Sequence, residues 1–81
     1  MIGRVVEIAT DGTHLAVDRG FMTVSRERER VGQVALDDIS ALVVHGHGAT
    51  FSANLVARLS ERGTPMVICG ANHASVSMLW P

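Results

Sequence analysis

The chain has 81 residues, with seven arginines, no lysine and eight acidic residues, giving a formal net charge of -1. A domain that binds nucleic acid through phosphates usually carries a basic excess, so this balance disfavours an autonomous nucleic-acid binder. The length allows one domain, and an apolar fraction of 47% is high for so small a soluble domain. We therefore expect exposed apolar surface that a partner chain or a further domain covers.

The cysteine content and the hydropathy of the sequence indicate the cellular compartment in which we expect the protein. The only cysteine, Cys69, excludes an internal disulfide framework and fits a reducing cytoplasm. A small buried hydrophobe on a core strand is the simplest interpretation of it. The sequence has no apolar run of about 18 residues and no secretory leader, so we expect a cytoplasmic protein without a membrane span.

The first 36 residues predict four strands. Apolar residues alternate with polar or small ones, and turn residues separate the segments. Asp11-Gly12 is a strong turn signal for residues at positive φ, and Gly32 permits a bulge. The expected strands are Ile2 to Ala9, His14 to Asp18, Phe21 to Ser25 and Val31 to Leu36, with turns at Thr10 to Thr13 and at Arg19-Gly20.

The segment Arg26 to Arg30 alternates arginine with glutamate. In a loop such charges form a solvated hairpin tip, which we favour. In a strand, Arg26, Arg28 and Arg30 would share one face that could touch phosphate. The following Asp37 to Ser40 predicts a polar turn, in which the aspartates cap local amides.

The middle of the chain predicts a strand, a helix and a second strand. Ala41 to Val44 and Met66 to Cys69 are short apolar runs typical of strands that are covered on both faces. Ser52 or Thr50 can cap the helix, and Gly63 ends it, with Pro65 two residues later. Its apolar stripe consists of Phe51, Leu55, Val56 and Leu59.

The last residues predict a turn at Gly70 to His73 and a strand from Ala74 to Trp80. An end at Pro81, directly after an apolar strand and without a polar tail, favours a fragment of a longer protein. The predicted fold class is α+β, mainly β. We expect two small β-sheets packed face to face as a β-sandwich, with one α-helix between buried strands.

Two sets of residues could carry chemistry. His45 and His47, with His73 and Cys69 nearby, offer zinc-ligand types, but the spacing matches no common zinc motif and no carboxylate lies close in sequence. Ser52 lies near His47 in sequence, yet the chain has no G-x-S-x-G elbow and the serine is already the predicted helix cap. The sequence therefore predicts no self-sufficient active site.

Several segments, in their order, resemble a known family. The chain is similar to the amino-terminal domain of the CRISPR-associated endonuclease and integrase that captures new spacers, in its type II form. The similarity spans essentially the whole chain. The segments that carry it are Gly3 to Ile8, Asp11 to Leu15, Leu36 to Gly46, Ser52 to Leu55, Leu59 to Cys69 and Met78 to Pro81.

The resemblance implies that residues 1–81 are a β-rich domain that helps to form a homodimer. It places catalysis in a larger helical carboxy-terminal domain, where a glutamate, a histidine and an aspartate bind a divalent metal, Mg or Mn. The parent would join protospacer DNA to the CRISPR array, an antiviral defence, together with a small ferredoxin-like partner protein. It implies no cofactor, no metal ligand and no catalytic residue within these 81 residues.

The resemblance also suggests where DNA could touch this domain, near the central hairpins of the dimer. The residues that match by position are Gly12, Thr13 and His14 in the Asp11 to His14 turn, with Arg4 and Arg19 able to reach phosphate. Two other readings stay open. One is a stand-alone oligomeric β protein, and the other is a minimal zinc hydrolase that uses His45, His47 and His73.

Overall fold

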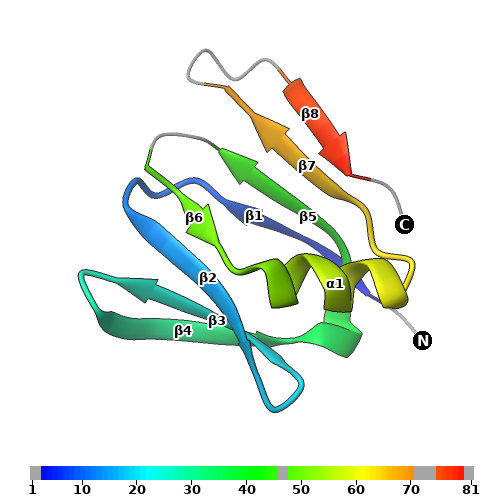
Figure 1. The fold of residues 1–81 in the computed structure, drawn as a ribbon, viewed down its shortest axis with the longest axis horizontal. Helices are drawn as coiled ribbons and strands as arrows, with labels where there is room; N and C mark the ends of the chain where they lie inside the picture. Colours follow the sequence, from blue (N-terminus) through cyan, green and yellow to red (C-terminus); the bar gives the residue numbers. More distant parts are fainter. Residues whose placement is uncertain (1–2, 46–47, 71–74, 80–81) are drawn as a thin grey trace.

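The computed structural model describes residues 3–45, 48–70 and 75–79, which form two four-stranded sheets and one α-helix (Figure 1). This arrangement confirms the predicted class, mainly β with two small sheets. The first sheet has the strand order β1 (Arg4–Ile8), β5 (Ile39–His45), β7 (Met66–Cys69), β8 (Ser75–Leu79). The second has the order β4 (Glu29–Ala35), β3 (Phe21–Arg26), β2 (Thr13–Asp18), β6 (Thr50–Phe51).

In the first sheet the predicted crossover connection is confirmed. β5 runs parallel to β7, and helix α1 (Ala53–Glu61) lies between them in the chain. β1 pairs with the other side of β5, also in parallel, while β8 is antiparallel to β7. The Asp11-Gly12 turn is present, but it connects strands of different sheets, and of the two residues only Gly12 has a positive φ, 73°.

The second sheet is built from two tight hairpins. Arg19-Gly20 joins β2 to β3, and Glu27-Arg28 joins β3 to β4, with positive φ at all four residues. Such pairs match the right-handed twist of the strands. The predicted solvated tip is confirmed at Glu27 and Arg28, which are exposed, whereas the other residues of the charged segment belong to β3 and β4. The predicted bulge is also confirmed, since Val24 pairs with Gly32 and Ser25 with Arg30, which skips Val31.

Helix α1 is capped by one of the two predicted residues. The Ser52 hydroxyl accepts a hydrogen bond from the Leu55 amide at 3.2 Å, and Gly63, at φ 71°, follows the last turn. The alternative cap was wrong, because Thr50 belongs to β6, a strand that the sequence did not reveal. The Ser52 amide donates to the Leu15 carbonyl at 2.9 Å, which keeps the chain extended beside β2 until the helix begins.

Two other boundaries differ from the predictions. The polar turn at Asp37 to Ser40 was wrong in its second half. A 3-10 helix, η1, occupies Leu36–Asp38, and β5 begins at Ile39, which is buried in the core. The last predicted strand is confirmed over Ser75–Leu79, whereas its ends at Ala74 and Trp80, and residues 71–73 of the preceding turn, lie outside the described residues.

The core lies between the two sheets and α1. Apolar side chains from both sheets, η1 and the helix meet there, and Leu55 and Leu59 provide the buried side of the helix. Burying such a side chain contributes roughly 1.5 to 3 kcal/mol. No helix in the described ranges is long and apolar enough to cross a bilayer. The buried residues of this hydrophobic cluster are Leu15, Met22, Leu36, Ile39, Leu42, Val44, Leu55, Leu59 and Met66.

Candidate functional site

The three predicted DNA-contact residues of the first turn lie together at the start of β2. Thr13 is buried, and its hydroxyl donates to the Thr10 carbonyl at 2.6 Å, which fixes the turn. His14 is exposed, with its Nδ1 atom 2.6 Å from the Thr50 hydroxyl on β6. Gly12 supplies the positive φ. Of these residues, His14 presents a polar side chain to solvent, and the contact with DNA stays a prediction.

The two predicted arginines lie away from that turn. Arg19 follows the last residue of β2, so the length of a six-residue strand, roughly 17 to 20 Å, separates it from His14. Arg4 begins β1, where it pairs in register with Ile39 at the start of β5. The structure thus separates Arg4 and Arg19 from the turn that carries the other three predicted contacts.

The histidine and cysteine positions form no metal site in the described part of the chain. His45 Nε2 contacts the carboxylate of Glu7 on the neighbouring strand, and buried Cys69 pairs in register with His45. His47 and His73 lie outside the described residues. Within the described ranges, no three His, Cys, Asp or Glu side chains gather closely enough to hold a metal.

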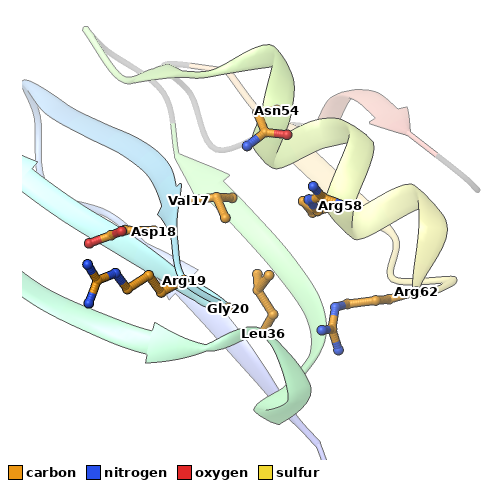
Figure 2. Close-up of a pocket in the computed structure, with 8 residues that line it drawn as sticks. All are labelled: Val17, Asp18, Arg19, Gly20, Leu36, Asn54, Arg58 and Arg62. Carbon is orange, nitrogen blue, oxygen red and sulfur yellow. The ribbon is translucent and has the colours of Figure 1, made fainter.

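Sequence reasoning missed an arginine-lined cavity of about 400 Å³. It lies between α1 and the β2–β3 turn, with Leu36 of η1 beside them (Figure 2). We call it the arginine cavity. Three of the seven arginines of the chain line it. The full lining is Val17, Asp18, Arg19, Gly20, Leu36, Asn54, Arg58 and Arg62.

Two elements position these side chains. Asn54, Arg58 and Arg62 recur every four residues, so they follow one side of α1. Figure 2 shows them facing the segment that carries Val17 to Gly20. The Leu36 amide donates to the Gly20 carbonyl at 2.9 Å, which holds that turn beside η1. The four-residue spacing indicates that the three helix residues share one side of α1. The opposite wall of the cavity could not be predicted, because it comes from a turn more than thirty residues earlier.

Ion pairs surround the arginine cavity. Arg58 contacts Glu61 at 3.1 Å, Arg62 contacts Asp37, and Asp18 contacts Arg30 at 3.3 Å. Among the described residues, Arg19 has no ion-pair partner. Four arginines therefore stand against three acids around the cavity, whereas the whole chain has a net charge of -1.

A second surface lies on the first sheet, on the side opposite the core. Leu42, Val44 and Met66 point into the core, so the alternating residues point outward. Val5 is 64% exposed, and neither Val43 nor Val67 is part of the core cluster. The register aligns Glu7 with Val43 and Val43 with Val67 across three strands. We call this set, Val5, Ala41, Val43 and Val67, the outer face, and the exposed Glu7 lies on the same side of the sheet.

The comparison with family models decides the identity of the chain. The model described as CRISPR associated protein Cas1 matches residues 6–81. The chain belongs to the Cas1 family. This confirms the family that the sequence resembles, while the type II form stays a prediction. No curated protein matches the chain.

Several solved structures share the fold of this Cas1-family chain. A chain of a partial Cas6-RT-Cas1–Cas2 complex is 18% identical, with a TM-score of 0.88, and the match covers 98% of this chain and 24% of that one. A CAS1 protein from Thermotoga maritima is 15% identical, with a TM-score of 0.83, covering 100% of this chain and 24% of that one. A casposase bound to integration product is 14% identical, with a TM-score of 0.75, covering 96% and 25%.

At these identities the likeness concerns the fold alone. The chain spans about a quarter of the length of each of these structures.

Proposed function

We propose that this chain is the amino-terminal dimerisation and DNA-positioning domain of a CRISPR-associated, metal-dependent DNA endonuclease and integrase that inserts new spacers. The observation that carries the proposal is the match to the Cas1 family model over residues 6–81. Within the family we propose the type II form, because the segments that resemble it extend from Gly3 to Pro81. The genes that flank the coding sequence test this finer assignment.

The outer face supports a role in dimerisation. Its valines come from three adjacent strands on the side of the sheet away from the core, where Val5 is exposed and Val43 and Val67 are half-buried. Apolar side chains on an outward sheet face fit association with another chain. β1 is also an edge strand, which can pair with a strand of a second copy. We propose that a second copy of the protein covers this face.

The metal of the proposed reaction does not fit the described residues. Metal-assisted phosphoryl transfer requires ligands that converge on the ion. The described part of the chain offers no such group, and the pair formed by His45 and Glu7 is too small a ligand set. We therefore assign the Mg or Mn ion, and the catalytic step, to a helical domain outside these 81 residues.

The proposed partners are DNA and a small ferredoxin-like adaptation protein. One similar structure is named as a complex of Cas6-RT-Cas1 with Cas2, which supports a Cas-protein partner for this chain. The domain would position its partners while the metal-binding domain acts on the DNA ends. We place both activities in the cytoplasm.

An integration assay tests this function. The protein at its natural length, with its adaptation partner, is mixed with a plasmid that carries a CRISPR array and a labelled protospacer duplex. Joining of the label to the array, dependent on Mg or Mn, is the expected result. Absence of joined product with every divalent ion and with the partner present would contradict the integrase assignment.

A further inference from the structure

We propose that Glu7 and His45 form half of a zinc site on the outward side of the first sheet, and that a second copy of the chain supplies the other half. The proposal rests on the proposed dimer and deepens it, because it assigns a metal ion to the interface that the outer face forms. This ion is separate from the Mg or Mn of the catalytic step, which we assign to the helical domain outside these 81 residues.

The two side chains already converge. Glu7 lies on β1 and His45 on β5, which are neighbouring strands of the first sheet (Figure 1). The Nε2 atom of His45 contacts the Oε2 atom of Glu7. An imidazole nitrogen and a carboxylate oxygen are both zinc ligands, each held about 2.0 to 2.2 Å from the ion. A small change of side-chain rotamer therefore allows both atoms to bind one ion.

A single copy of the chain is an incomplete site. Structural zinc sites have four ligands from the protein. Within the described ranges, no group of three His, Cys, Asp or Glu side chains could hold a metal ion. A symmetric dimer repeats each side chain on the two sides of its axis. Two copies therefore supply two imidazoles and two carboxylates, which is a full tetrahedral set.

The pair lies directly beside the outer face. Glu7 is in register with Val43, and His45 follows Val43 by two residues on β5, so all three side chains lie on the same side of the sheet. A step of two residues along a strand spans roughly 6.4 to 6.8 Å. A dimer axis that passes beside Val43 therefore places the pair of each copy about one side-chain length from the axis.

The charge of Glu7 favours a cation at this interface. Its side chain is 60% exposed, whereas that of His45 is 18% exposed. A dimer that covers the outer face removes water from both Glu7 carboxylates and brings their charges together. Buried charges in proteins are paired or coordinate metals, because an uncompensated one is costly. A Zn²⁺ ion held by both carboxylates supplies the opposite charge.

Three variants of the protein at its natural length distinguish a metal ligand from an ordinary ion pair. Glu7→Gln and His45→Gln each remove a ligand. Glu7→His also removes the carboxylate, but it introduces another side chain that binds zinc. A structural ion pair is lost in both Glu7 variants, whereas the zinc site is lost only in Glu7→Gln.

Sedimentation equilibrium measures the dimer Kd of metal-depleted protein with and without added Zn²⁺. Mg²⁺ is present throughout, so that the ion of the proposed catalytic domain is held constant. A ligand that binds the dimer and not the monomer lowers the dimer Kd. We expect Zn²⁺ to lower it about tenfold or more for the wild type and Glu7→His, and to leave it unchanged for Glu7→Gln and His45→Gln. After dialysis, atomic emission should find one zinc ion fewer per two chains in these last two variants.

The outcomes separate this proposal from the proposed function. A wild type that dimerises equally with and without Zn²⁺ overturns the zinc site and leaves the dimer intact. An equal response of the wild type and Glu7→Gln locates the zinc elsewhere and also overturns the site. A wild type that stays monomeric in both conditions contradicts the site and the dimer together. Melting curves verify that each variant is folded, and the two Glu7 variants decide the question if His45→Gln does not fold.

Discussion

Ser52 has a structural role that explains its side chain. Its hydroxyl accepts from the Leu55 amide, which also donates to the Ser52 carbonyl at 3.1 Å. Ser52→Ala should lower the free energy of unfolding by about 1 kcal/mol. Urea denaturation measures the change, and Ser60→Ala, on the exposed side of the same helix, should cost far less. Equal effects of the two variants would contradict the assignment of the cap.

Local chemistry explains which single residues could be predicted. The cap at Ser52 and the left-handed Gly63 depend on their immediate neighbours, so the sequence is sufficient to predict them. The arginine cavity was missed because its two walls meet only after folding. Arg19 was singled out as a phosphate contact, but nothing near it in sequence indicates Arg58 or Arg62.

At the scale of elements, the Glu27-Arg28 turn is shaped by its backbone more than by its side chains. Both residues have positive φ, 53° and 67°, a conformation that costs most non-glycine residues roughly 1 kcal/mol or more. Replacing the pair with Asn-Gly through Glu27→Asn and Arg28→Gly should therefore raise the free energy of unfolding by about 1 kcal/mol.

Thermal denaturation measures the effect of the turn variant. Gln33→Gly is the control, because a glycine within β4 removes a side chain from the strand and should lower stability. A turn variant that melts at or below the wild-type temperature would show that the hairpin does not depend on this turn geometry.

Strands were predictable to the extent that their patterns are local. Met66 to Cys69 was predicted with its observed bounds, because a short apolar run after Pro65 has few alternatives. β6 was missed because two residues are too few to show an alternation of apolar and polar side chains. They form a strand only because they pair with β2. The pairing of β1 with β5, across more than thirty residues, was likewise beyond what alternation can indicate.

At the scale of the whole molecule, the structure shows where the apolar residues that do not fit into the core lie. A chain that is 47% apolar fills its core and still leaves the valines of the outer face outside it. The sequence predicted covered strands in β5 and β7, and the structure covers them on the core side. We propose that a second copy covers the other side, which is the central claim of the proposed dimer.

Two valines allow a matched test of that claim. Val5 and Val31 are exposed to nearly the same extent, 64% and 63%, and each lies on an edge strand, but Val5 belongs to the outer face and Val31 to the bulge of β4. A buried unpaired carboxylate is costly, so Val5→Asp should break a dimer that covers the outer face. Val31→Asp adds the same charge away from that face.

Sedimentation equilibrium of the wild type, Val5→Asp and Val31→Asp, at the natural length of the protein, is the most direct measurement. We expect the wild type and Val31→Asp to be dimers and Val5→Asp to dissociate, with a dimer Kd at least tenfold higher. A wild type that is monomeric, or a Val5→Asp variant that dimerises as tightly as the wild type, would contradict dimerisation through the outer face.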